Sequence, residues 1–352
     1  MVDRTPSPLA AGTAAATPAL RMQDLRVEFS AGARRIEAVN GVDLSLRPGE
    51  VVALIGESGS GKSVTLRAVM RLHAARSTCI TGRLEVAGQD VLAMSARELS
   101  ALRGKQVAMI FQEPLLALDP VYPVGAQIVE AIRRHESVGR AEAHARALAL
   151  FERVRIPSPE RRLAAYAHEM SGGMRQRAMI ALALACRPQL LLADEPTTAL
   201  DATVQIQILL LLRELQQEMG LAIVFVTHDI GAAAEVADRM AVMYAGRIVE
   251  QGPAAILLTR PRHPYTLSLL QSRAHGAMQK GQRLQTIAGS PPDLSRLPPG
   301  CAFAERCAWA QDACRATQPP EVALGAGHSA RCLRLDVVDA VRPAAAPATA
   351  TG

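Results

Sequence analysis

Short apolar runs alternate along the chain with stretches whose apolar residues have a helical spacing. The apolar runs lie at residues 51–55, 107–111, 189–193 and 221–226. Runs of this length that are apolar throughout are typical of parallel strands buried on both faces. Helical patterns follow at residues 62–73, 172–186, 203–218 and 231–238. The alternation predicts an α/β domain built on a parallel sheet.

Other parts of the chain depart from this alternation. Residues 24–29 and 42–46 predict short half-buried strands. Residues 115–170 are rich in Ala and Arg and helical in pattern, which predicts a helical subdomain inserted between two strands. After about residue 255 the composition shifts towards Pro and Cys, which marks a boundary. We expect disordered tails, rich in Ala, Pro and Thr, at residues 1–20 and 336–352.

A glycine-rich loop with the sequence GESGSGKS, the phosphate loop (residues 56–63), joins the first apolar run to the helix that follows. Its glycines let the backbone N–H groups turn towards one centre, and the helix N-terminus adds a positive dipole there. In such loops the lysine reaches the β- and γ-phosphates and the last residue binds Mg²⁺. A chance glycine-rich turn is the alternative. The residues expected to bind a nucleoside triphosphate are Gly56, Ser58, Gly59, Gly61, Lys62 and Ser63.

Two carboxylates end the apolar segment LLLADE at residues 190–195. Asp194 has the position of a Walker-B aspartate, which orders Mg²⁺ through its waters. Glu195 follows it, where a carboxylate can polarise an attacking water as a general base. The alternative is a strand that ends in solvated acids, and the phosphate loop argues against it. The two segments together predict the hydrolysis of a nucleoside triphosphate.

The composition narrows the class of protein. The 352 residues are 49% hydrophobic and 20% charged, so the chain can bury a core. Aromatic residues make up only 3%, which argues against a surface that stacks single-stranded nucleic acid. The net charge of +6 suits an anionic ligand, although a solvated surface explains most of it. No apolar run reaches the roughly 18 residues of a membrane span, and the N-terminus has no apolar signal segment, so we expect a cytosolic protein.

The segment HEMSGGMRQR at residues 168–177 resembles the signature motif of ATP-binding cassette (ABC) ATPases. Small residues open a predicted helix there, so bare N–H groups face outward and an anion is expected to bind. In that family the anion is the γ-phosphate held by the phosphate loop of a second subunit. The resemblance thus implies that Ser171, Gly172 and Gly173 complete the site of a partner, and that two chains close around two ATP molecules. A helix with an ordinary serine cap is the alternative.

Four further positions resemble the family. Gln112 resembles the Q-loop glutamine, which contacts Mg²⁺ and the attacking water, and His228 in VTHD resembles the switch histidine that touches the γ-phosphate. Asp201 in TTALD resembles the D-loop aspartate, with a helix N-cap as its alternative. Phe29 resembles the aromatic residue that stacks on adenine, and a core phenylalanine fits its position equally well.

Within the family, the chain resembles the oligopeptide/dipeptide importer branch over residues 24–335. The segments that carry this resemblance are RPQLLLADEPTTALDATVQIQIL, GMRQRAMIALAL and RPRHPYTLSLLQS. Met170, where leucine is usual, and LLALDP, where Ser-Leu-Asn-Pro is more frequent, depart from the branch pattern, and the second segment lies in the region that faces membrane subunits. The resemblance implies a P-loop NTPase fold of the α/β class, with an N-terminal antiparallel β subdomain. Its implied divisions are an ABC ATPase domain at 21–255, a helical subdomain inside it at about 115–178, and a small extension at 256–335.

The resemblance also implies a function and a setting. The chain is expected to be the ATPase subunit, with ATP and Mg²⁺, that powers import of di- and oligopeptides at the cytoplasmic face of the cell membrane. Its expected partners are a related but distinct ATPase subunit, two integral membrane permease subunits and, indirectly, an extracytoplasmic substrate-binding protein. The alternatives are import of nickel or glutathione, or a soluble ABC ATPase that acts on nucleic acid or ribosomes. One phosphate loop, one signature motif and no basic arm argue against the soluble class.

Four of the six cysteines cluster near the end of the chain, at Cys301, Cys307, Cys314 and Cys332. Their spacing differs from the close pairs of zinc sites, in which two to four residues separate the ligands. The sequence PPGCAFAERCAWAQDAC resembles the C-terminal motif of peptide-importer ATPases, some of which hold a [4Fe-4S] cluster there. An iron–sulfur cluster, a zinc site with or without His328, and metal-free thiols are therefore open alternatives.

Overall fold

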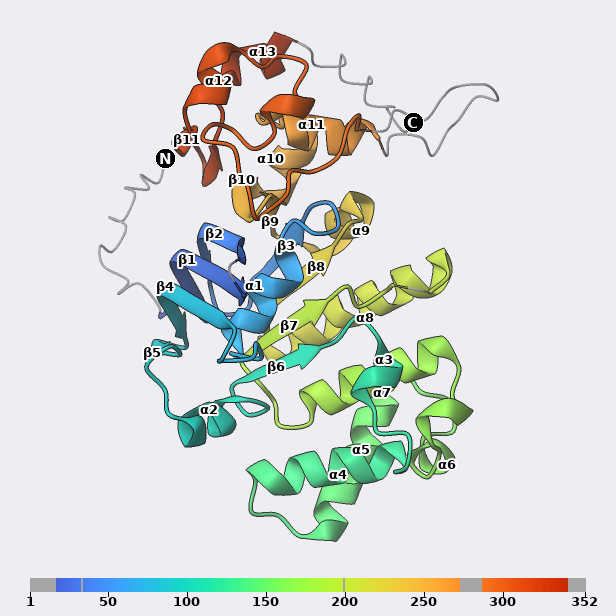
Figure 1. Ribbon diagram of the computed structural model, residues 1–352. Helices are drawn as coiled ribbons and strands as arrows, with labels where there is room; N and C mark the ends of the chain where they lie inside the picture. Colours follow the sequence, from blue (N-terminus) through green and yellow to red (C-terminus); the bar gives the residue numbers. More distant parts are fainter. Residues whose placement is uncertain (1–16, 33, 199, 273–286, 341–352) are drawn as a thin grey trace, which may run out of the picture.

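The computed structural model describes residues 17–32, 34–198, 200–272 and 287–340. Most residues of the two expected tails lie outside these ranges. Helix α13 (Leu335–Ala340) falls at the start of the expected C-terminal tail. Figure 1 shows a helical region at one end of the molecule, two sheets in the middle and the C-terminal part of the chain at the other end.

The larger sheet has eight strands in the order β11-β12-β10-β9-β3-β8-β7-β6. The parallel strands are β3 (Val51–Ile55), β6 (Val107–Ile110), β7 (Leu190–Asp194), β8 (Ala222–Thr227) and β9 (Arg239–Tyr244). This confirms the predicted parallel sheet. The antiparallel strands that continue it beyond β9 are β10 (Arg247–Pro253), β12 (His328–Ala330) and β11 (Val322–Gly325).

The parallel strands are apolar throughout because each face of the sheet is covered by a separate core. Val51 and Ile55 of β3 belong to one core, whereas Val52 and Leu54 belong to the other, as the alternation of side chains in a strand requires. Helix α1 (Lys62–Val69) packs in the second core. The helices that contribute to the first core include α7 (Gly172–Leu184), α8 (Ala202–Met219) and α9 (Ile230–Val236).

The smaller sheet is antiparallel, with the order β2-β1-β4-β5. Its strands are β1 (Leu20–Ala31), β2 (Arg34–Leu46), β4 (Thr78–Val86) and β5 (Gln89–Asp90). This confirms the predicted N-terminal antiparallel sheet, whose buried side chains share a core with α1. Helix α2 (Ala96–Leu102), which begins with a capping box between Ser95 and Glu98, leads from this sheet to β6.

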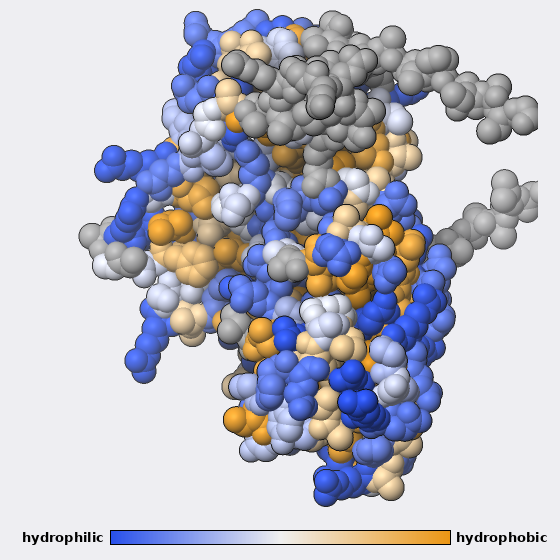
Figure 2. All heavy atoms as spheres, turned by 90° about the vertical axis from the view of Figure 1, so that its right-hand side faces the viewer, coloured by the Kyte–Doolittle hydropathy of each residue, from blue (hydrophilic) through white to orange (hydrophobic). Residues whose placement is uncertain are grey.

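A helical region lies between β6 and β7. It comprises α3 (Pro114–Ala117), α4 (Val124–His135), α5 (Arg140–Arg153) and α6 (Pro159–Leu163), a 3₁₀ turn at Ala167–Glu169, and then α7. Val124, Ile128 and Ile132 form one buried stripe of α4, because residues four apart share a helix face. Figure 2 shows that the lower part of the molecule carries mainly hydrophilic side chains on one face, with scattered apolar ones.

The chain after β10 forms an extension whose strands β12 and β11 continue the larger sheet beyond β10. Its elements are α10 (Ala254–Thr259), α11 (Pro264–Gln271), a 3₁₀ turn at Ala304–Arg306, α12 (Asp312–Ala316), β11, β12 and α13. The buried Glu250 of β10 anchors it by accepting hydrogen bonds from the N–H groups of Arg262 and His263, at 2.7 and 2.9 Å, and it pairs with His328 at 2.8 Å. In the described part of the chain, no helix has the length and apolar character that a membrane span needs.

Candidate nucleotide site

The phosphate loop connects β3 to α1 and needs glycine for two different reasons. Gly59 and Gly61 have φ angles of 77° and 102°, in the left-handed region that favours glycine. A Cβ atom on Gly56 would lie 2.2 Å from the carbonyl oxygen of Met243, and one on Gly61 would lie 2.4 Å from that of Ala38. The loop is therefore held tightly against neighbouring backbone, with α1 beginning at its end.

Lys62 is buried and folds back over the loop. Its Nζ donates to the carbonyl oxygens of Gly56 and Glu57, at 2.8 and 2.7 Å. Burial lowers the pKa of Lys62, and the carboxylates of Glu195, Asp194 and Glu57 oppose that shift. The side chain thus presents a cation among backbone groups, which is the arrangement a triphosphate requires.

Ser63 and Asp194 meet at the start of α1 and the end of β7. The Ser63 hydroxyl donates to Asp194 Oδ1 at 2.6 Å, and Asp194 Oδ2 is buried without a hydrogen bond. Burial raises the pKa of Asp194, whereas Ser63 and Arg67 lower it. The Ser63 hydroxyl and the Asp194 carboxylate, one oxygen of which has no hydrogen bond, are hard oxygen donors of the kind Mg²⁺ prefers, so these two residues fit the ion.

Glu195 stands where the ends of three strands converge. Its Oε2 accepts hydrogen bonds from Gln112 Nε2 at 3.2 Å and from Thr198 Oγ1 at 2.8 Å, and it lies 3.7 Å from His228 Nδ1. The structure thus brings together Gln112, Glu195 and His228, which the sequence predicts as site residues. Thr198 was not predicted, and its place in EPTT, three residues after Glu195, was the available signal.

The signature and D-loop residues act as helix caps within the chain. Ser171 Oγ accepts from the Met174 N–H at 3.3 Å, and Asp201 Oδ1 accepts from the Val204 N–H at 3.0 Å. Gly172 and Gly173 open α7. In Figure 1, α7 and α1 are separated by strands β6 and β7. Both capping alternatives are therefore realised, and contact of Ser171, Gly172 and Gly173 with a partner's nucleotide stays a prediction.

Phe29 lies in β1. Its ring packs edge-on against His73, with 5.2 Å between the ring centroids, and it is partly buried against the core of the smaller sheet. This contact is what a core phenylalanine would make. Stacking of the same ring on adenine is not tested by it.

Two residues of the extension, which the sequence patterns did not single out, contact the phosphate loop. Tyr265 Oη accepts a hydrogen bond from the Glu57 N–H at 2.8 Å, and Arg306 forms an ion pair with the Glu57 carboxylate. Both residues are more than 200 positions away from Glu57 in the sequence. The site is therefore built from the extension as well as from the parallel sheet.

The four C-terminal cysteines line one small pocket, but the structure does not support the iron–sulfur or zinc alternative. All four are free thiols, and burial raises the pKa values of Cys301 and Cys307 and brings that of Cys332 to about 12. Among the residues that the structure describes, no group of three or more His, Cys, Asp or Glu side chains is arranged to hold a metal ion.

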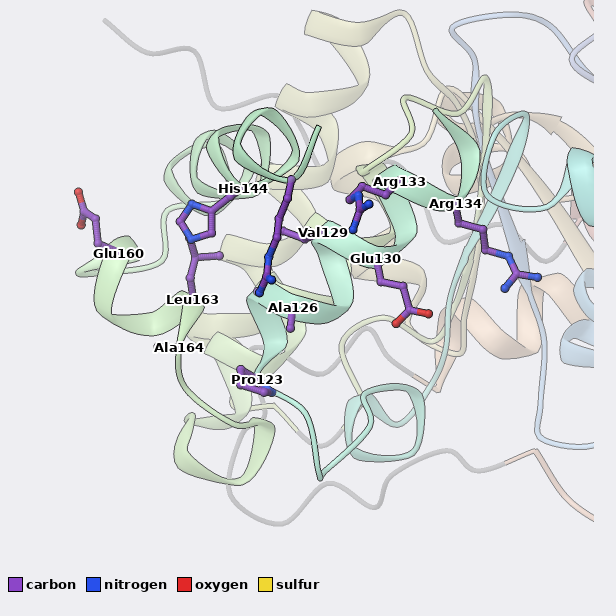
Figure 3. Close-up of a pocket in the computed structure, with 12 residues that line it drawn as sticks. Pro123, Ala126, Val129, Glu130, Arg133, Arg134, His144, Glu160, Leu163 and Ala164 are labelled. Atoms are coloured by element: carbon purple, nitrogen blue, oxygen red, sulfur yellow. The ribbon is translucent and has the colours of Figure 1, made fainter. Parts of the chain in front are cut away.

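A separate hollow lies in the helical region. It has a volume of about 540 Å³ and is lined by residues of α4, α5 and α6. Figure 3 shows His144 and Glu160 on one side of it, and Arg134 at the other end of the row of side chains along α4. None of the predicted nucleotide-site residues lines this hollow, so it is not part of that site.

Comparisons with known proteins agree with this geometry. Residues 39–198 match the family described as ABC transporter, and residues 249–314 match the oligopeptide/dipeptide transporter, C-terminal region. A Brucella melitensis protein named as a peptide import ATP-binding protein is 49% identical over 328 residues, which are 90% of this chain and 97% of the relative. A Sinorhizobium fredii protein named as a peptide ABC transporter ATP-binding protein is 47% identical over 320 residues, covering 91% and 96%.

Solved structures give the same result. The dimeric structure of a bacterial ABC transporter cassette has a TM-score of 0.60 and 27% identity, and covers 67% of this chain and 98% of its own. The same cassette is known as a post-hydrolysis dimer bound to ADP and Pi. Part of an ABC transporter complex from Clostridium perfringens has a TM-score of 0.60 and 25% identity, covering 69% and 92%. The chain therefore belongs to the ABC transporter family of ATP-binding proteins, in the group that carries the oligopeptide/dipeptide transporter C-terminal region.

Proposed function

We propose that this chain is the ATP-hydrolysing subunit of an ABC importer for di- and oligopeptides. The observation that carries the proposal is the convergence of Lys62, the Ser63–Asp194 pair and Glu195 in a chain with the oligopeptide-type extension. We assign residues 21–255 to the ATPase domain, with its helical subdomain at about 115–178, and residues 256–335 to the extension.

The proposed mechanism uses charge and proton transfer. Lys62 balances the negative charge of the β- and γ-phosphates, and Ser63 and Asp194 would hold Mg²⁺, which would supply further charge neutralisation. Glu195 accepts a proton at Oε2 from the water that attacks the γ-phosphorus, as the bond from that phosphorus to the bridging oxygen breaks. Gln112 and His228, which lie beside Glu195 Oε2, orient the same water.

A second ATPase subunit would complete each site. Ser171 and Gly172 are exposed at the N-terminus of a 13-residue helix, so their backbone N–H groups can meet an anion from outside the chain. We assign that anion to the γ-phosphate on a partner chain, which is related to this one but distinct from it. Asp201 opens α8 and belongs to the same proposed contact surface.

The permease subunits would dock on an apolar patch next to Gln112. Phe111, Leu115, Val121 and Tyr122 are exposed by 37%, 51%, 70% and 59%, within twelve residues of each other. The patch lies in the segment that connects β6 to α4. Movement of the helical region on nucleotide binding near Gln112 would therefore be transmitted to a partner bound there. Such docking would put the chain at the cytoplasmic face of the membrane, and an extracytoplasmic substrate-binding protein would deliver cargo to the permeases.

The test is peptide uptake by the host cells. We expect a strain that lacks the gene to lose uptake of a radiolabelled tripeptide. The wild-type gene should restore it, whereas Lys62→Ala and Glu195→Gln, expressed at the same level, should not. Uptake of radiolabelled nickel and of glutathione is measured in the same strains. If peptide uptake is unchanged in the deletion strain while either other uptake is lost, the peptide assignment is wrong.

A further inference from the structure

The extension contacts the phosphate loop through a bidentate ion pair between Arg306 and Glu57. Arg306 Nη1 and Nη2 donate to Oε2 and Oε1 of Glu57, at 2.6 and 3.0 Å. The Arg306 side chain is 4% exposed and that of Glu57 is 28% exposed, so water screens this pair far less than a surface pair. A forked contact of this kind fixes direction as well as distance.

Arg306 is itself held in place on several sides. Its Nε donates to the carbonyl oxygen of Ala288 at 2.9 Å, and Nη2 also donates to that of Ile287 at 3.2 Å. Nη1 makes a further hydrogen bond to Tyr244 Oη at 3.2 Å, and the guanidinium lies 5.9 Å from the ring centroid of Phe303. The Glu57 carboxylate raises the pKa of Arg306, so the group is a permanent cation. These contacts fix the position of the Arg306 guanidinium, which can therefore hold the Glu57 carboxylate in one place.

Glu57 passes this restraint to Lys62. Its carbonyl oxygen accepts the hydrogen bond from Lys62 Nζ at 2.7 Å and another from the Ser60 N–H at 3.3 Å, while its own N–H donates to Tyr265. The extension therefore holds the side chain of Glu57 through Arg306 and its backbone through Tyr265. Both restraints act on the residue whose carbonyl orients the catalytic lysine.

The charge of Glu57 makes this support necessary. Glu57 places a carboxylate inside the loop that must bind a triphosphate, and two anions close together repel each other. Arg306 neutralises that carboxylate and turns it away towards the extension. We propose that Arg306 is a positioning residue for ATP: it neutralises Glu57 and holds the phosphate loop in its binding conformation. This inference rests on the proposed ATPase activity and deepens it.

The test compares ATP affinity in single and double variants of the full chain. Binding of ATP with Mg²⁺ is measured by calorimetry, and kcat and KM for ATP hydrolysis are measured in parallel. Loss of a charged hydrogen-bonded partner predicts that Arg306→Gln weakens ATP binding by about tenfold or more. Arg306→Lys keeps the charge without the fork, so its affinity should lie between those of the wild type and Arg306→Gln.

The double variant separates positioning from general loss of structure. If Arg306 acts through Glu57, then adding Glu57→Gln to Arg306→Gln removes the uncompensated carboxylate and should recover part of the affinity. Independent effects would instead multiply, which would overturn the proposal. An affinity of Arg306→Gln within twofold of the wild type would overturn it as well.

The matched control is Arg315→Gln, in the same extension. Arg315 is 51% exposed and reaches Glu305 and Asp312 only at 3.6 and 3.7 Å, so its loss should leave ATP affinity unchanged. Thermal melting of each variant identifies any that fails to fold, and Glu57→Gln, which leaves the extension's own contacts intact, still reports on the pair. Normal ATP binding without peptide uptake would count against the proposed transport function and not against this inference.

Discussion

Glu195 has an unfavourable backbone conformation, and one oxygen of its side chain has several polar neighbours. Its φ angle is 47°, a left-handed conformation that costs a residue other than glycine about 1–3 kcal/mol. Its Oε2 is shared by Gln112 and Thr198, with His228 close by. An outlier of this kind at the end of a buried strand indicates that the position of the carboxylate matters more than local stability.

Replacing Glu195 with Gln should separate ATP binding from hydrolysis. Glutamine keeps the shape and the hydrogen-bonding oxygen but cannot accept the proton, so we expect turnover to fall by about 100-fold or more. ATP affinity should stay close to that of the wild type, because Lys62 and Ser63 are unchanged. Steady-state hydrolysis and calorimetric ATP binding measure the two effects, with Glu218→Gln as a surface control. Turnover at the wild-type rate would contradict the role of general base.

Single residues were predictable from the sequence where they lie in contiguous motifs. Lys62 and Ser63 sit in the phosphate loop, and Asp194 and Glu195 are adjacent, so their chemistry shows in a few letters. The contact between Arg306 and Glu57 spans 249 positions and has no such signature. The spacing of the four C-terminal cysteines likewise does not fix how the thiols are arranged in space, so the sequence left three alternatives open for them.

At the scale of the element, the N-terminus of helix α11 depends on one capping side chain, His263. His263 caps α11 with Nδ1, which accepts the Tyr265 N–H at 3.0 Å, and Pro264 follows at the first helical position. Complete burial lowers the pKa of His263 to about 4, and Glu250 opposes that shift. The helix that carries Tyr265 to the phosphate loop therefore begins at a neutral imidazole.

Stability should fall as this imidazole is forced to take a proton. Between about pH 6.5 and 4 the unfolded chain binds a proton at His263 that the folded chain does not, so the free energy of unfolding decreases with falling pH. The expected contribution to the slope is up to about 1.4 kcal/mol per pH unit. His263→Asn, which preserves a capping side chain, should remove this contribution, whereas the exposed His144→Asn should not. Denaturant unfolding at several pH values measures the slopes, and equal slopes for wild type and His263→Asn would refute the prediction.

The ends of elements were harder to predict than their existence. The helix expected at 62–73 ends at Val69, because Arg71 turns into a left-handed conformation and its side chain donates to the carbonyl of Met94 at 2.7 Å. The helix expected at 172–186 ends at Leu184, shortly before Arg187, which is also left-handed. Apolar periodicity reports which face of a helix is buried, and tertiary contacts decide where the helix stops.

At the scale of the whole molecule, the phosphate loop and the start of the signature helix are separate parts of the surface of one chain. The nucleotide-binding residues gather at the ends of β3, β6, β7 and β8, while Ser171 is exposed at the start of α7. We therefore predict that a second subunit completes each site. This prediction rests on the resemblance of the signature motif, because the two halves of a site that closes between chains are never neighbours within either chain.

The rate of ATP hydrolysis should accordingly depend on the association of two subunits. We expect ATP turnover per chain to rise as the protein concentration is increased, or on addition of the partner ATPase subunit. Ser171→Asp keeps an N-capping side chain but places a negative charge against the partner's γ-phosphate, so it should abolish that rise and leave ATP binding intact. Light scattering reports the assembly state. Full turnover by a monomer, constant across a hundredfold dilution, would contradict this view.

The contact between Glu57 and Arg306 also sets an order of events during synthesis. A ribosome that adds about 5–20 residues per second needs roughly 12–50 s to advance from Glu57 to Arg306. By the end of that time the chain has completed β3, β6, β7 and β8, whose ends carry the predicted nucleotide-site residues. The arginine proposed to secure the loop is made only afterwards, so its contact with Glu57 is among the last contacts of the site to form.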